Sequence, residues 1–486
     1  LRLKLISKVT MLPKNSERHR QKINDSFEFL TDGHASTSYC DLDNTNSVNT
    51  LKKVKNSSIK ALSICQDKNS MWQRDMEDRF FVVDNYGRRS DTCFLGLIDG
   101  HHGMTAAETV AAELPLLFLD QLSQTDLSYR MTKEEQHTLD AFATVITDDY
   151  REKERIFSDR QENKTHKTNT YEWIHKAYAK AFWRMDRLLQ LGRNEVSRVR
   201  WSGCSAVTCL MERLPSENTD DTEERKHFEN SMQSSLTRTT EDVAGLLHIA
   251  NIGNIHAVLC KNGKSYRLSE EHSTSNVREK KRILQNGGNI STNEPDGLVE
   301  GHLRTTRGLG YHGDPVLKRS VIPVPQSISV PIDDSCQFLI LASNGLWEVL
   351  DYNEVCALTL RTFTHYLKTH ECILQNGASL YNCQYLITLP EEELSDSKAT
   401  NDQQVGTEML DSNTEIFLPD SKGSLTHGKP ECSRMSGVTS KALYDNAASY
   451  ISEQLVKAAL DAGSRDNITV LIVLLNGCAN QRLITL

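Results

Sequence analysis

The chain has 486 residues, of which 38% are hydrophobic and 25% are charged, and its formal net charge is −9 at pH 7. A chain of this length can bury a sizeable core in one large domain or two ordinary ones. The negative charge argues against a nucleic-acid partner, and no stretch reaches the roughly 18 apolar residues that a membrane-spanning helix needs.

The start of the chain does not resemble a targeting segment. Residues 1–12 are short and mildly basic, and no small-residue cleavage site of a secretory signal follows them. Because the chain begins with Leu1, we expect either a fragment or a start at Met11. Residues 1–58 are mostly polar, and we expect them to form no stable structure.

A globular pattern runs over residues 59–476 and predicts a single domain, followed by a short tail at 477–486. Polar segments without apolar periodicity, at about 124–168, 213–242 and 389–440, are interpreted as insertions in that domain. Short apolar runs predict strands at 80–83, 94–98, 205–211, 246–252, 256–260, 338–342 and 468–475. Helical periodicity predicts helices at 105–114, 171–191 and 447–462.

Several predicted strands follow one another without a helix between them. This order favours antiparallel sheets over a doubly wound parallel sheet. We therefore predict an α+β fold in which two antiparallel sheets form a central β-sandwich flanked by helices. Trp72 and Trp347 are expected to pack in the core.

The twelve cysteines are scattered, and none forms a Cys-x-x-Cys pair. Several lie inside apolar strand patterns, where free thiols are usually buried and inert. This distribution favours an intracellular, reducing compartment, either the cytoplasm or the nucleus.

Four acidic residues, in three segments of the chain, lie at the ends of predicted strands. Glu77 and Asp78 precede a strand, Asp99 ends one, and Asp466 opens another. Carboxylates at strand ends can converge on one rim of a sandwich, and such hard oxygen ligands suit Mg²⁺ or Mn²⁺ rather than Zn²⁺. Taken singly, each residue is explained as well by a turn or a cap.

Eight motifs together resemble, in order and spacing, the type 2C (PPM-type) serine/threonine protein phosphatases over nearly all of residues 60–476. They are 72–78 (WQRDMED), 99–103 (DGHHG), 202–207 (SGCSAV), 250–254 (ANIGN), 279–288, 307–310 (RGLG), 341–347 (LASNGLW) and 463–469 (GSRDNIT). The resemblance implies a β-sandwich flanked by helices. It also implies a site with two Mg²⁺ or Mn²⁺ ions that hydrolyses phosphoserine or phosphothreonine.

The resemblance assigns roles to five residues of this chain. Glu77 corresponds to a ligand of the second metal ion, and Asp99 with the carbonyl of Gly100 corresponds to the bridging ligand. Asp466 corresponds to a carboxylate of the first metal ion, and His101 to the general acid. In that family the ions generate the attacking hydroxide and neutralise charge on the phosphoryl group.

Four positions depart from the family pattern, and each loses a charge. Gln73 stands where the phosphate-clamping Arg is expected, and Asn344 stands where a metal-binding Asp is expected. Asn254 and Tyr311 each replace an Asp. An amide cannot make the bidentate grip of Arg, and the affinity for a cation depends on the charge of its ligands. We therefore expect one bound ion rather than two, or none.

The degenerate site favours a pseudophosphatase that binds a protein or phosphoprotein partner without efficient dephosphorylation. Two alternatives remain. The retained acidic residues and His101 are compatible with a metal-dependent phosphatase, a phosphoric monoester hydrolase, of reduced activity. The polar insertions are compatible with a scaffold that acts through its loops. No nucleic-acid or membrane partner is predicted, and the oligomeric state is left undetermined.

Overall fold

The computed structural model describes residues 47–140, 171–190, 198–213, 243–292, 297–376 and 439–483. The chain divides into two compact units, residues 1–363 with 443–486, and residues 364–442. The described residues of the second unit are helical: 364–376 end helix α10 (Tyr352–Asn376), and 439–442 begin helix α12 (Thr439–Asp461). The predicted insertions at 213–242 and 389–440 lie almost wholly outside the described residues, as does the part of the predicted insertion 124–168 that follows residue 140. Its described part, 124–140, packs against the domain, since Tyr129 and Leu139 belong to a buried apolar cluster.

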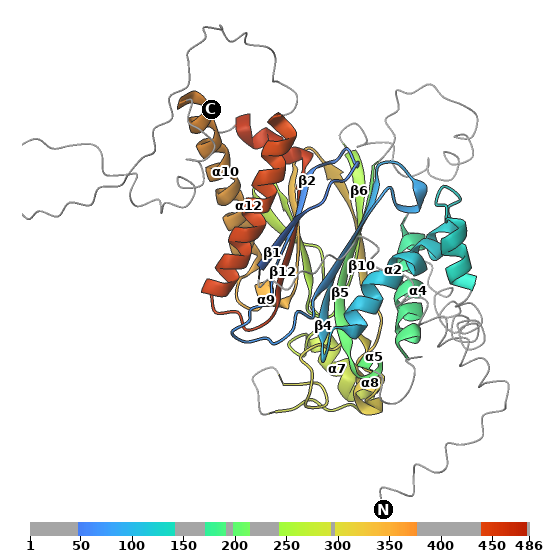
Figure 1. The fold of residues 1–486 in the computed structure, drawn as a ribbon. Coiled ribbons are helices and arrows are strands. Elements are labelled where there is room, and N and C mark those ends of the chain that lie inside the picture. Colours follow the sequence, from blue (N-terminus) through green and yellow to red (C-terminus); the bar gives the residue numbers. More distant parts are fainter. Residues whose placement is uncertain are drawn as a thin grey trace, which may run out of the picture. The chain divides into compact units, whose positions relative to one another are not determined.

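Two antiparallel sheets form the first unit (Figure 1). One has the strand order β1-β2-β12-β11-β7-β8, with bounds Ser47–Leu51, Ile59–Asp67, Ile468–Leu475, Cys336–Ala342, His256–Lys261 and Lys264–Arg267. The other has the order β10-β6-β5-β4-β3, with bounds Gln326–Asp333, Val243–Ile252, Gly203–Arg213, Thr92–His101 and Arg79–Asp84, and β9 (Leu309–Gly310) pairs with β5. The predicted α+β fold with two antiparallel sheets is confirmed.

The core lies between the two sheets. Leu95 and Val207 from one sheet and Leu339 and Leu471 from the other belong to a single buried apolar cluster. Phe94, the neighbour of Leu95, belongs instead to a second cluster beneath the helices, because successive side chains of a strand point to opposite faces. The central strands are therefore apolar on both faces, which explains why their sequences read as continuous hydrophobic runs.

Two helices cover the outer face of the sheet that contains β4. Helices α2 (Thr105–Ser123) and α4 (Glu172–Gln190) lie side by side there (Figure 1), and their buried faces share a cluster with Phe94. On the other sheet, the Ser452 hydroxyl of α12 lies 3.0 Å from the Ser63 hydroxyl of β2, and the Phe363 ring of α10 contacts Phe338 of β11. Among the described helices, none is long and apolar enough to span a membrane.

Short helices occupy the connections. They are η2 (Tyr86–Arg88), α5 (Arg198–Trp201), α7 (Val277–Gln285), α8 (Pro315–Ser320), α9 (Asn344–Trp347) and η6 (Asn476–Leu483). Asn276 caps α7 by accepting a hydrogen bond from the Arg278 N–H, and Asp314 caps α8 by accepting from two N–H groups of its first turn. These caps satisfy backbone donors that have no partner inside a helix.

Several predictions about elements need correction, and one is that helix α12 begins at Thr439 rather than at residue 447. Residues 47–51 form strand β1 along β2, although no stable structure was expected before residue 59. Helix α2 continues to Ser123, although its predicted end was residue 114. Pro115 removes one N–H donor from this helix, but Leu117, Phe118 and Leu122 beyond it are buried. Their burial, which contributes about 1.5–3 kcal/mol each, outweighs the lost hydrogen bond.

Candidate active site

Asp99 lies near the end of strand β4, and only 2% of its surface is exposed. Its Oδ2 accepts a hydrogen bond from the backbone N–H of Asn344 (3.0 Å), and its Oδ1 lies 3.6 Å from Nε2 of His101. Burial raises the pKa of Asp99 well above its usual value, and the charges of Asp466 and Glu77 raise it further. The three acidic segments that the sequence singled out therefore converge.

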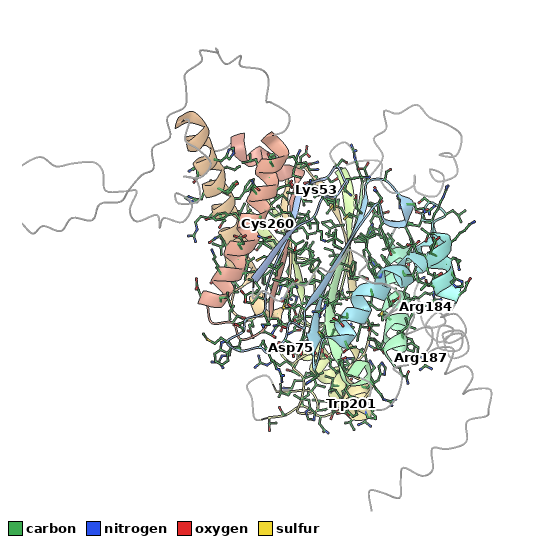
Figure 2. All side chains as sticks on the ribbon, viewed as in Figure 1. Lys53, Asp75, Arg184, Arg187, Trp201 and Cys260 are labelled. Atoms are coloured by element: carbon green, nitrogen blue, oxygen red, sulfur yellow. The ribbon has the colours of Figure 1, made fainter. Side chains whose placement is uncertain are left out.

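The loop that carries Glu77 is held tightly against the end of β4. A Cβ atom at Gly100 would come within 2.5 Å of the Glu77 carbonyl oxygen, so this approach requires glycine. Glu77 Oε1 accepts a hydrogen bond from the N–H of Gly103 (3.0 Å), and the Glu77 N–H donates to Oδ1 of Asn467 (2.8 Å). Asn467 follows Asp466 directly, so one amide side chain ties two acidic segments together. Figure 2 labels Asp75 of the same loop, at the lower end of the two sheets in that view.

Tyr311 is the hydrogen-bond partner of His101. Its hydroxyl lies 2.8 Å from Nδ1 of His101, and its side chain is almost fully buried. The Tyr311 backbone has a φ of 61°, a left-handed conformation that is rare for an aromatic residue. The ring lies over Gly203, where a Cβ atom would approach it to 2.3 Å. Burial lowers the pKa of His101 and raises the pKa of Tyr311.

Gln73 lies in the loop before β3, and its amide is directed toward the acidic cluster. Its Nε2 donates to the Arg465 carbonyl (2.9 Å) and lies 3.4 Å from Oδ1 of Asp466. Its neighbour Trp72 is 53% exposed, contrary to the expectation of core packing, and the Arg465 guanidinium lies 4.7 Å above the Trp72 ring. Trp347 is half-buried and donates to the Ala342 carbonyl (2.7 Å).

Asn344 and Asn254 both face one pocket of about 560 Å³. The backbone N–H of Asn344 is bonded to Asp99, but its side-chain amide has no hydrogen-bond partner among the described residues. The Asn254 Oδ1 accepts a hydrogen bond from the Ser205 hydroxyl (3.0 Å), and its Nδ2 has no partner within the same part of the chain. Glu77, Asp99 and Asp466 do not line this pocket. The pocket nevertheless adjoins the acidic cluster, because the Asn344 N–H donates to Asp99 and the charge of Glu348, which lines the pocket, raises the pKa of Asp99.

The chain is similar in sequence to known proteins. A family model described as "Protein phosphatase 2C" matches residues 175–375. The human protein "Protein phosphatase 2C-like domain-containing protein 1" is 45% identical over 99% of this chain and 82% of its own length. The protein of the same name from Mus musculus is 39% identical over 99% of this chain and 81% of its own length. The chain belongs to the protein phosphatase 2C family.

More distant members match a smaller part of this phosphatase 2C chain. "Protein phosphatase 2C homolog 1" of Saccharomyces cerevisiae is 26% identical over 61% of this chain and 81% of its own length. The crystal structure of serine-threonine phosphatase 2C from Toxoplasma gondii aligns with a TM-score of 0.46 at 14% identity, over 88% of this chain and 99% of that chain.

Members of the phosphatase 2C family are generally Mg²⁺- or Mn²⁺-dependent, so the acidic cluster must be tested as a metal centre. Buried carboxylates that raise one another's pKa favour a nearby cation. Among the described residues, however, no three His, Cys, Asp or Glu side chains are arranged to hold a metal ion. Glu77, Asp99 and Asp466 each accept a hydrogen bond from a backbone N–H instead. The cluster suits a cation by charge but is not a preformed cage. Metal binding by these three residues and Gly100 stays a prediction.

Asp78, which the sequence grouped with Glu77 but to which the resemblance assigned no role, is a further buried acid of this phosphatase 2C site. Asp78 is 1% exposed, and its burial raises its pKa well above the usual value. The charges of Asp99 and Asp466 raise this pKa further. Its Oδ2 accepts a hydrogen bond from the Thr469 hydroxyl of β12 (2.7 Å). Nothing in the local sequence distinguishes it from a solvated acid, because its burial depends on the distant strand β12.

Proposed function

We propose that this phosphatase 2C domain is a pseudophosphatase that binds a protein partner without efficient dephosphorylation. In this proposal the fold and the rim of acidic side chains serve as a binding surface. Fewer charged groups remain that could stabilise a phosphoryl transition state. Electrostatic stabilisation is usually the largest single contribution to catalysis, and the loss of one such contact commonly costs about 10²–10³ in rate.

The observation that carries the proposal is the arrangement of Gln73. Its neutral amide stands where the resemblance places a phosphate-clamping arginine, and it is engaged with Arg465 and Asp466 rather than free for a ligand. A bidentate arginine grip on a phosphate cannot be reproduced by an amide. At Asn344 the expected carboxylate is also an amide, so both the phosphate grip and the metal charge are weakened.

The alternative of a working phosphatase of reduced activity rests on the retained residues. Glu77, Asp99, His101 and Asp466 occupy one region, and the His101 imidazole lies beside Asp99. A phosphatase with loosened metal affinity would need high Mn²⁺ concentrations. The scaffold alternative rests on insertions that lie outside the described residues.

The deciding experiment is a hydrolysis assay with a phosphothreonine peptide and an aryl phosphate in millimolar Mn²⁺. We expect the full chain to release no more phosphate than the Asp99→Ala variant at equal concentration. Mn²⁺-dependent turnover that disappears in Asp99→Ala would overturn the proposal and support the alternative of a weak phosphatase. Calorimetric titration with Mn²⁺ in parallel measures whether one ion, two ions or none is bound.

A further inference from the structure

Helix α7 presents a face of exposed side chains at the lower end of the two sheets in the view of Figure 1. Its other face holds the helix on the domain, because Glu279 and Ile283, one turn apart, are buried. The exposed residues on the opposite side, here called the α7 surface, are Val277, Arg278, Lys280, Lys281 and Leu284. The surface combines apolar and positively charged side chains.

The apolar part of the α7 surface consists of Val277 and Leu284, which are 77% and 51% exposed. Together with Lys281 they follow the spacing i, i+4 and i+7, so the three side chains share one helical face. The two apolar side chains are separated by two helical turns, roughly 10 Å along the axis. A single exposed apolar side chain is ordinary, but a partner that covers both would remove two from water at once.

The charged part of the α7 surface has no compensating anion. Within the described part of the chain, the side chains of Arg278, Lys280 and Lys281 make no ion pair or hydrogen bond. Arg278 and Lys281 are neighbours at i and i+3, and like charges at that spacing repel. The only carboxylate of the helix, Glu279, is bonded instead to Arg307 at 2.7 Å and to Arg282 at 3.1 Å.

The combination of charges and apolar side chains fits an acidic protein segment better than other anions. Helices that lie in a membrane interface are often about 20–30 residues long, whereas α7 has 9 residues. Nucleic-acid sites commonly use on the order of 6–10 phosphate contacts, and the chain as a whole has a net charge of −9. Protein interfaces commonly combine an apolar centre with a charged rim.

We propose that the α7 surface binds an acidic segment of a partner protein. The carboxylates of the segment pair with Arg278, Lys280 and Lys281, and its apolar side chains cover Val277 and Leu284. To meet both, those apolar side chains lie roughly 10 Å apart. This inference goes beyond the proposed function, because it uses no residue of the acidic cluster and holds whether or not the domain hydrolyses phosphate.

The test is a titration of the full chain against a labelled synthetic peptide, followed by fluorescence anisotropy. The acidic probe is a helical peptide with two Leu residues seven positions apart and Glu residues beside them. Its twin has Gln in place of every Glu. At low ionic strength we expect the acidic probe to bind at least about tenfold more tightly than the twin, and added salt should reduce this difference. Equal affinities overturn the inference.

Two variants and a control locate the site. Lys281→Glu should weaken binding of the acidic probe about tenfold by placing a repelling charge on the surface, and Leu284→Ser should weaken it by removing an apolar contact. Lys133→Glu makes the same charge reversal at another exposed helical lysine and should bind as the wild type does. All three positions are exposed, so Tm should stay nearly unchanged. Unchanged binding by Lys281→Glu, or an equal loss in Lys133→Glu, contradicts the assignment.

Other anionic partners are tested with the same variants. Vesicles of equal parts phosphatidylserine and phosphatidylcholine, and a single-stranded oligouridylate, are titrated in place of the peptide. If either binds more tightly than the acidic probe and loses binding in Lys281→Glu, the assignment to a protein partner is wrong.

The outcomes also separate this inference from the proposed function. Mn²⁺-dependent turnover together with weakened probe binding by Lys281→Glu would remove the pseudophosphatase and leave the α7 surface standing. Absence of turnover together with unchanged probe binding by Lys281→Glu would do the reverse.

Discussion

The hydroxyl of Tyr311 lies 2.8 Å from Nδ1 of His101, inside the buried end of the sandwich. One residue is the general-acid candidate, and the other occupies a position where the family pattern has a carboxylate. A phenol can hold the imidazole by a hydrogen bond, but it lends no negative charge to the acidic cluster. The contact therefore preserves the orientation of His101, while the negative charge around it is lower than in the family pattern.

Replacing Tyr311 with Phe should remove the hydrogen bond to His101 while the aromatic ring still fills its place. We expect a loss of about 1 kcal/mol in the free energy of unfolding for the missing hydrogen bond. We also expect a changed ¹⁵N chemical shift at Nδ1 of His101. Tyr266→Phe, which alters a half-exposed tyrosine on β8, should change neither quantity. An unchanged Nδ1 shift in Tyr311→Phe would mean that the two groups are not hydrogen-bonded in solution.

Restoring the charges of the family pattern should restore metal affinity. The variant Asn344→Asp places a carboxylate beside Asp99. We expect Mn²⁺ affinity to rise at least about tenfold, since affinity follows ligand charge. Calorimetry measures it, and Asn289→Asp adds the same charge at an exposed position as a control. Tight binding of two Mn²⁺ ions by the wild type would refute the charge argument.

Glu113 on α2 should make stability depend on pH. Burial raises the pKa of this carboxyl from 4.5 to about 7. The folded state then binds more protons than the unfolded state between these values, so stability falls as the pH rises from about 4.5 to 7. Glu113→Gln should stabilise the protein by up to about 3 kcal/mol at pH 8 and hardly at all at pH 4.5. Urea unfolding of both proteins measures this difference.

The control for that prediction is Glu134→Gln. Glu134 is exposed on a helix, so its substitution should leave the free energy of unfolding nearly unchanged. If Glu113→Gln is equally destabilised at both pH values, burial does not raise the pKa of this carboxyl in the folded protein.

Glu212 on β5 should show the opposite pH dependence. Burial alone would raise the pKa of its carboxyl, but the hydrogen bond from His248 and the charge of Arg89 lower it to about 2. The stabilisation is therefore present above pH 4.5 and is lost as the pH falls toward 2. Glu212→Gln should lower the free energy of unfolding by about 3 kcal/mol at pH 7, because it leaves His248 and Arg89 without their carboxylate partner.

The ion pair between Lys261 and Asp333, at 2.6 Å, is less buried than Glu212 and serves as a comparison. Asp333→Asn should cost less than about 1 kcal/mol, because solvent screens exposed pairs. Thermal unfolding in both variants checks the ranking, and an Asp333→Asn loss that equals the Glu212→Gln loss would contradict it.

The cysteines whose side chains the structure describes should be unreactive in the folded protein. They form no disulfide and are buried, at positions 65, 93, 204, 209, 260, 336, 356 and 478. Burial raises the pKa of the Cys93, Cys204 and Cys209 thiols, which suppresses the reactive thiolate. A thiol reagent at pH 8 should label these eight positions only after denaturant is added. Rapid labelling of Cys204 in the native protein would contradict its burial.

The sequence by itself determined the fold class, seven of the twelve described strands and the helices α2, α4 and α12, but it missed helix α10. Strand β12 spans the predicted residues 468–475, and α4 differs from its prediction by one residue at each end. These elements follow from local periodicity, which packing then reinforces. Helix α2 beyond Pro115 and strand β1 could not be read this way, because both depend on contacts with distant parts of the chain.

Motif order also singled out Glu77, Asp99, His101 and Asp466 as candidate site residues, together with the four altered positions, and their roles stay predictions. Only the tertiary structure decided how these residues meet. It buried Asp78 beside them, joined Tyr311 to His101, and turned Gln73 toward Asp466. It also placed Asn254 and Asn344, which are 90 positions apart in the sequence, on one pocket. Local sequence patterns do not predict these long-range contacts. Antiparallel pairing brings distant strand ends together only when the whole sandwich forms.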